Sequence, residues 1–107
     1  MAKVIWTDKA VSNLESIHSY ISRDSQAYAN RFIKEIIKRT SVLESFPSSG
    51  RIVPEFKFNW LRELVYENYR IVYTTKNHPD YIKIVTVFRC SQLLENLYDP
   101  DFDKNET

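Results

Sequence analysis

Two stretches in the first half of the chain repeat apolar residues at helical spacing. The first repeat consists of Val11, Leu14, Ile17, His18 and Ile21. These positions share one face of a helix, with polar residues between them. Thr7 or Asp8 precedes the repeat and is suited to cap the helix. The apolar run 3–6 before this cap predicts a short strand.

The second stretch keeps the helical period for longer and gives the stronger prediction. Its apolar face comprises Ala29, Phe32, Ile33, Ile36, Ile37, Thr40 and Leu43. Arg23-Asp24-Ser25 interrupts the pattern between the two stretches and supplies the second cap. Two amphipathic helices with so short a break are expected to form an antiparallel hairpin. Each apolar stripe then needs another layer to cover it.

From Trp60 onward the pattern changes to strands. β-Branched and aromatic residues predict strands over 60–66, 69–75 and 81–89, joined by the Glu67-Asn68 link and a turn at 77–80. Phe46 to Gly50 ends the second helix, 51–59 is predicted to be a loop, and 91–98 a short terminal helix. The order is β-α-α-β-β-β. This order predicts an α+β fold, with the two-helix hairpin packed on an antiparallel sheet.

Length and composition narrow the class of protein. The 107 residues fit one domain, expected over 1–98, followed by an acidic and flexible tail over 99–107. No apolar run approaches the roughly 20 residues of a membrane span. The N-terminus reaches Thr7-Asp8 too soon for a signal peptide, so a cytoplasmic location is expected.

Residue counts exclude several kinds of chemistry. The single glycine, Gly50, excludes phosphate loops and dinucleotide motifs. The single cysteine, Cys90, excludes an internal disulfide and a cysteine metal cluster, and its thiol is expected to be buried and inert. His18 is expected to be packed or partly exposed, and His78 to be exposed in a turn. No nucleophile–histidine pair can be argued, so we expect no metal and no cofactor.

Charge is divided unevenly along the chain. Residues 1–94 hold 14 basic and 9 acidic side chains, whereas 95–107 hold five acidic and one basic. A mildly basic body suits either an ordinary solvated surface or contact with an acidic partner or nucleic acid. The charge alone does not assign nucleic acid.

The remaining candidates are polar and aromatic residues of the predicted strands. They are Arg62, Glu63, Tyr69, Arg70, Tyr73 and Arg89. Alternation places Tyr69 and Tyr73 on one face and Arg70 on the other, and Glu63 can pair with Arg70 across the hairpin. One interpretation is a cross-strand ion pair beside aromatic packing. The other is a cationic patch for phosphates or a carboxylate-bearing peptide.

Several motifs resemble the RelE/ParE toxins of type II toxin–antitoxin modules. They are Phe46-Pro47, Gly50-Arg51, Pro54-Glu55, Leu61-Arg62-Glu63-Leu64, Tyr69-Arg70-Ile71-Val72-Tyr73, and Ile84-Val85-Thr86-Val87-Phe88 followed by Arg89. The resemblance runs from Val4 to about Leu94. It implies a small cytosolic bacterial protein, neutralised by a cognate antitoxin in a toxin–antitoxin hetero-oligomer. Some members of the family poison DNA gyrase, and others cut mRNA in the ribosome.

Details of the resemblance favour the ParE side. Arg70 matches the family's arginine, whereas Glu63 stands where a lysine often stands and Arg89 where a histidine often closes the last strand. The first hypothesis is therefore a gyrase inhibitor without chemistry of its own, which binds target or antitoxin through the six candidates above. On this hypothesis, Arg70→Ala is expected to weaken toxicity or antitoxin binding without unfolding the domain.

Two alternatives stay open. One is a ribosome-dependent mRNA endonuclease that uses Arg70, Arg89 and Arg62 on the scissile phosphate. The other is a degenerate, non-toxic relative that still binds antitoxin.

Overall fold

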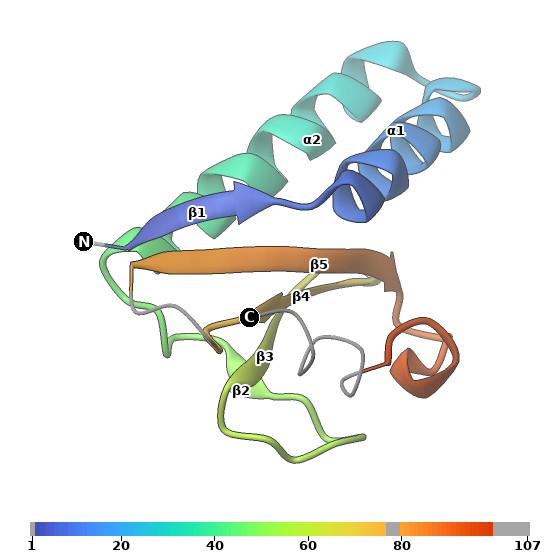
Figure 1. Ribbon diagram of the computed structural model, residues 1–107. Helices are drawn as coiled ribbons and strands as arrows, with labels where there is room; N and C mark the ends of the chain where they lie inside the picture. Colours follow the sequence, from blue (N-terminus) through green and yellow to red (C-terminus); the bar gives the residue numbers. More distant parts are fainter. Residues whose placement is uncertain (1, 77–79, 100–107) are drawn as a thin grey trace.

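The computed structural model describes residues 2–76 and 80–99. Its elements in chain order are β1 (Lys3–Trp6), α1 (Asp8–Ser22), α2 (Gln26–Ser41), the 3-10 turn η1 (Val42–Glu44), β2 (Arg51–Ile52), β3 (Leu61–Tyr66), β4 (Tyr69–Thr74), β5 (Tyr81–Arg89) and the 3-10 turn η2 (Leu94–Asn96) (Figure 1). The predicted turn with His78 and the acidic tail beyond Asp99 lie outside the described residues.

Side-chain caps begin both helices at the predicted positions. Thr7 Oγ1 accepts a hydrogen bond from the Ala10 backbone N–H, and Ser25 Oγ accepts one from that of Tyr28. These bonds satisfy N–H groups that have no partner within the helix. The Thr7 hydroxyl also donates to the Ile84 carbonyl at 2.9 Å, so the cap ties the start of α1 to the sheet.

The sheet is mixed, with the strand order β1-β5-β4-β3-β2. β1 runs parallel to β5, and every other pair is antiparallel. The prediction of a loop over all of 51–59 was wrong at its start, because Arg51 and Ile52 pair with Glu63 and Arg62 and form a fifth strand. Two residues carry too little alternation to be recognised, and only the neighbouring β3 makes them a strand.

The predicted terminal helix over 91–98 is also corrected. Only Leu94–Asn96 forms a single 3-10 turn. Helix propensity over so short a segment is weak without packing support. The observed order is β-α-α-β-β-β-β, and the predicted α+β class is confirmed. The prediction of a wholly antiparallel sheet is corrected, because β1 pairs in parallel with β5.

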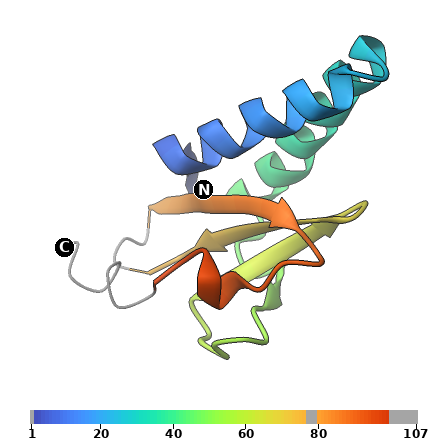
Figure 2. The ribbon, with the colours of Figure 1, turned by 90° about the vertical axis from the view of Figure 1, so that its right-hand side faces the viewer.

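Each face of the sheet has its own apolar core. On the helix side, Phe32 and Ile36 of α2 pack with Ile71 and Tyr73 of β4. On the opposite side, the core comprises Val53, Leu61, Val72, Val85, Phe88 and Leu94. The connection from β2 to β3 and the segment around η2 cover this second core (Figure 2). We call residues 53–60 the strap.

Two positions of the predicted apolar helix faces lie at the edge of the layer instead. Val11 is 43% exposed and Ile37 is 50% exposed. The sheet covers the centre of each stripe and leaves these flanking positions to solvent. Within the described residues, none of the helices is both long and apolar enough to cross a membrane.

Candidate functional site

Arg70 lies on the sheet face away from the helices and is 6% exposed. Alternation predicted that it lies on the opposite face from Tyr69 and Tyr73. Its Nε donates to Glu63 Oε1 at 2.7 Å. Its two terminal nitrogens donate to the two carboxylate oxygens of Glu55, at 2.7 and 2.6 Å. The guanidinium carbon lies 4.9 Å from the centre of the Phe88 ring. Arg70 is therefore held by two carboxylates and an aromatic face.

Glu63 is 1% exposed and joins two arginines. One carboxylate oxygen accepts from Arg70, and the other accepts from Arg51 Nε at 2.6 Å and from Arg51 Nη2 at 2.5 Å. The predicted pair between Glu63 and Arg70 is thus confirmed. It is diagonal, because Arg70 lies opposite Val65 in the register.

Glu55 completes the network and was not among the candidate residues. Besides the two bonds from Arg70, its Oε2 accepts from the Leu94 backbone N–H at 3.0 Å. The hydrogen bonds from Arg70 are the largest cause that lowers the pKa of Glu55 to about 2, and the Leu94 bond acts in the same direction. The paired carboxylates, Glu55 first, raise the pKa of Arg70. Arg70 thus joins β4 to β3 and to the strap, and Glu55 extends the network to η2.

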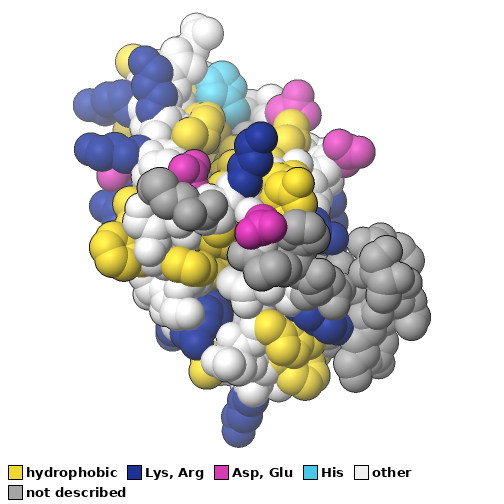
Figure 3. All heavy atoms as spheres, turned by 60° about the vertical axis from the view of Figure 1, so that its left-hand side comes forward, with side chains coloured by type: hydrophobic (Ala, Val, Ile, Leu, Met, Phe, Trp, Pro, Cys, Tyr) yellow, Lys and Arg dark blue, Asp and Glu magenta, His cyan; other side chains and the backbone are white. Residues whose placement is uncertain are grey.

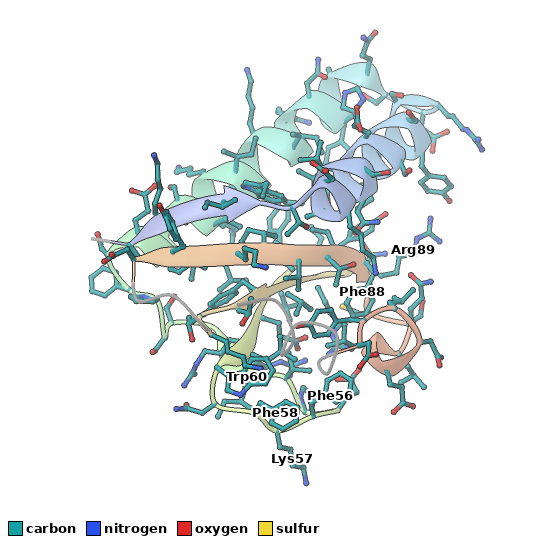
Figure 4. All side chains as sticks on the ribbon, in the orientation of Figure 1. Phe56, Lys57, Phe58, Trp60, Phe88 and Arg89 are labelled. Atoms are coloured by element: carbon teal, nitrogen blue, oxygen red, sulfur yellow. The ribbon has the colours of Figure 1, made fainter. Side chains whose placement is uncertain are left out.

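The strap carries a ladder of aromatic rings. Phe56 and Phe58 stack at 6.1 Å with 6° between their planes, and Phe58 and Trp60 stack at 4.8 Å with 8°. Lys76 Nζ lies 4.4 Å from the centre of the Trp60 ring. Figure 4 shows the three rings below the sheet, with Lys57 pointing away from the molecule. These stacked rings cover the sheet face on which Arg70 lies.

The alternation in the strap was a signal that sequence reasoning missed. Phe56-Lys57-Phe58-Asn59-Trp60 places an apolar ring at every second residue. Lys57 has a φ of 58°, a value uncommon for a residue with a side chain, so the strap is not a regular strand.

Tyr73 lies on the helix side of the sheet, and its hydroxyl is hydrogen-bonded to the segment before β2. Its hydroxyl donates to the Pro47 carbonyl at 2.8 Å and accepts from the Gly50 N–H at 2.9 Å. Burial raises the pKa of this phenol. A Cβ on Gly50 would lie 2.6 Å from that hydroxyl, so close approach is the reason for glycine here.

Arg62 also binds its own surroundings. Its guanidinium donates to the Gly50 carbonyl at 2.9 Å, to Asn59 Oδ1 at 2.9 Å and to the Asn59 carbonyl at 3.2 Å. These bonds join the residue before β2 to the end of the strap before β3.

Arg89 is exposed at the end of β5, and its environment differs from that of the other two arginines. Its guanidinium carbon lies 4.6 Å from the centre of the Tyr20 ring in α1. Interaction with Tyr69, and then with Tyr20, raises the pKa of Arg89. Tyr69 itself is buried, with its ring 5.3 Å from that of Phe32.

The structure does not gather the three arginines into one patch. Arg70 is on one face, whereas Arg62 and Arg89 are on the other, opposite Tyr73 and Tyr69 in the register. Tyr69 and Tyr73 are about 13 Å apart along β4. Figure 4 shows Arg89 at the end of β5 and the three strap rings below the sheet.

The other candidates for chemistry are dispersed as well. His18 Nε2 lies 2.7 Å from Asn30 Oδ1 and joins α1 to α2, as its partly packed position predicted. The prediction of a buried thiol was wrong, because Cys90 follows the last strand and is exposed. Among the described residues, no group of three metal-binding side chains is found.

The fold and the site define a class: a small α+β protein with a helical hairpin on one face of a mixed sheet and an ion-paired strap on the other. A scan against protein-family models matches residues 4–94 to the ParE toxin of the type II toxin–antitoxin system parDE. The chain belongs to this ParE toxin family, so the resemblance read from the sequence is confirmed.

Comparison with known proteins supports the fold. A search of curated proteins finds no significant match. Among solved structures, the chain is similar to one described as the chromosomal ParDE TA system from P. aeruginosa, with a TM-score of 0.68 and 21% sequence identity. The similarity covers 83% of this chain and 96% of that chain. At this identity it shows a shared fold.

Proposed function

We propose that this ParE-family toxin acts in the cytoplasm by inhibiting DNA gyrase through surface contact, and that a cognate antitoxin neutralises it. The observation that carries the proposal is that the Arg70 side chain is buried and ion-paired. Its guanidinium is buried under the strap and forms ion pairs with Glu63 and Glu55. It is not available to a substrate phosphate without breaking both ion pairs.

The separation of the arginines argues against the endonuclease alternative. RNA cleavage through the 2′-hydroxyl needs a base, an acid and a cation within reach of one phosphate. Arg62 is engaged with backbone carbonyls, and Arg89 lies on the other side of the sheet from Arg70. Within the described residues the histidine is His18, which lies in the helical hairpin. These positions support a toxin that works by binding.

The surface of the helical layer supports an antitoxin partner. A cavity of about 390 Å³ between the helices is lined by residues that include Val11, Leu14, His18 and Ile33. Figure 3 shows apolar side chains beside the histidine, with lysine and arginine side chains nearby. β1 and β2 are the two edges of the sheet. A peptide can dock as a helix in such a groove or add a strand at such an edge.

The test in cells is to induce the chain alone in bacteria and to read growth together with a DNA-damage reporter. Arrest with induction of the reporter is expected, because a poisoned gyrase leaves broken DNA. Arrest with a silent reporter would favour mRNA cleavage. Continued growth with the protein accumulated would favour the degenerate relative.

The test in vitro uses purified protein. We expect inhibition of supercoiling by gyrase, and no ribosome-dependent cleavage of mRNA in a purified translation mix. Cleavage in that mix, with gyrase unaffected, would overturn the proposal. Restored growth on co-expression of the antitoxin encoded beside the toxin tests the second half of the proposal.

A further inference from the structure

A cavity of about 250 Å³ lies between α1 and the end of β5. Its polar lining includes Lys9, Asn13, Ser16, Tyr20, Arg89 and Gln92. We call it the Arg89 pocket. It is separate from the Arg70 network, which lies on the opposite face of the sheet.

A β-bulge shapes the wall of this pocket. Val72 pairs with Thr86, but the next residue, Tyr73, pairs with Ile84, so Val85 is an extra residue in β5. Asn13 Oδ1 accepts from the Thr86 hydroxyl at 2.9 Å and from the Val87 N–H at 3.0 Å. These bonds hold α1 against the bulge and fix the distance between Tyr20 and Arg89.

The pocket has positive charge without a countercharge. No aspartate or glutamate of the described residues lines it, and none of them forms an ion pair with Arg89. Lys9 Nζ donates one hydrogen bond to the Leu97 carbonyl and keeps its charge and its other N–H groups. Arg89 interacts with the Tyr69 and Tyr20 hydroxyls, but neither phenol neutralises its charge, and its position over the Tyr20 ring orients the guanidinium before anything binds.

The size and lining favour a carboxylate on a short carbon stem. Ile17, Val87 and Leu97 give the pocket an apolar wall, while the guanidinium can bind a carboxylate with two parallel hydrogen bonds. A nucleic-acid strand needs several cations that follow its backbone. The two cations of this pocket, Lys9 and Arg89, are too few for a nucleic-acid strand, and a pocket of this volume matches a single acidic side chain.

We propose that the Arg89 pocket receives one aspartate or glutamate side chain of the cognate antitoxin. This inference rests on the proposed function, since it assumes that an antitoxin binds. It assigns to Arg89 a binding role that Arg62 and Arg70 do not share, because those two are engaged within the fold.

The experiment measures the affinity of the purified toxin for the antitoxin encoded beside it, by calorimetry at two salt concentrations. Arg89→Gln is expected to bind at least about 10-fold more weakly, since it loses a charge-assisted, two-point contact. Arg39→Gln is the matched control. Arg39 is also an exposed arginine stacked on a tyrosine, but it is paired with Glu35 on α2. We expect it to bind within about 2-fold of wild type.

A second arm identifies the occupant. Each acidic residue of the antitoxin is changed to its amide and measured against wild-type toxin and against Arg89→Gln. One amide variant is expected to weaken binding to wild type and to have little further effect on Arg89→Gln, as paired groups do in a double-mutant cycle.

Four results would overturn the inference. Wild-type affinity of Arg89→Gln, or additive losses for every acidic residue, would show that the pocket receives no antitoxin carboxylate. Arg89-dependent binding of a DNA oligonucleotide, with antitoxin affinity unchanged, would assign the pocket to phosphate. An antitoxin that binds neither wild type nor variant would overturn the proposed partner itself, and the inference with it.

Discussion

At the scale of single residues, the three arginines of the sheet have three different roles. Arg70 is buried between two carboxylates, Arg62 holds backbone carbonyls, and Arg89 is exposed beside Tyr20. The sequence predicted that Arg70 lies on the opposite face from Tyr69 and Tyr73, because alternation along a strand is a local property. It did not predict the second partner, because Glu55 reaches Arg70 only after the strap has folded across the sheet.

Arg70→Ala is expected to destabilise the domain, contrary to the sequence-based expectation that it would leave the fold intact. The substitution leaves the carboxylate of Glu63, 1% exposed, without its buried partner. Loss of one member of a buried pair costs about 3–5 kcal/mol. Urea denaturation measures this loss. Arg51→Ala is the control, because Arg51 contacts the same carboxylate from an exposed position and should cost about 1 kcal/mol or less. Equal midpoints for Arg70→Ala and wild type would contradict the assignment.

Gly50→Ala is expected to destabilise the fold by close contact rather than by backbone strain. The added Cβ would lie 2.6 Å from the Tyr73 hydroxyl and 2.7 Å from the Glu63 carbonyl oxygen. Forced contacts of this kind cost about 1–3 kcal/mol, measured as a lower thermal midpoint. Tyr73→Phe should recover only part of this loss in the double variant, because the backbone contact remains. Ser49→Ala, at an exposed neighbour, should leave the midpoint unchanged.

At the scale of elements, the helices and the three long strands were predictable, and the strap was not. α1 and α2 each bury a stripe of residues at helical spacing, and β5 is a run of β-branched and aromatic residues buried on both faces, so the sequence pattern indicates each element. β2 forms because β3 pairs with it, and the 3-10 turn at Leu94 forms because the Glu55 carboxylate accepts a hydrogen bond from the Leu94 N–H. Both partners come from elsewhere in the chain. Such elements depend on tertiary contacts that a local pattern does not contain.

The strap gives the domain a specific dependence on acid. The pKa of Glu55 falls from 4.5 to about 2 in the folded chain. Since the folded value lies below the unfolded one, the contribution is present above about pH 4.5 and is lost as the pH falls towards 2. It amounts to about 3 kcal/mol at most. Glu55→Gln should therefore be less stable at pH 7 and should have a flatter stability profile between pH 4.5 and 2. A profile as steep as that of wild type would show that other carboxylates dominate.

At the scale of the whole molecule, the two faces of the sheet differ in how their side chains are engaged. The face under the strap holds the buried ion pairs and the aromatic ladder, whereas the helical face carries the inter-helix cavity and the Arg89 pocket. Substitutions on the strap side should therefore reduce toxicity and antitoxin binding together, through the loss of folded protein. Substitutions at the Arg89 pocket should change recognition while the thermal midpoint stays near that of wild type.

This separation leads to a prediction about escape from the antitoxin. If Arg89 contacts the antitoxin and not the target, Arg89→Gln keeps its toxicity and is silenced less well. We expect it to arrest growth at a level of antitoxin co-expression that fully protects cells from the wild-type toxin. Arg39→Gln, the exposed control on α2, should remain silenced at that level. Growth arrest is scored against induction of the antitoxin, with toxin levels matched by immunoblot. A variant that has lost its toxicity in the absence of antitoxin, although folded, would place Arg89 in the surface that binds the target.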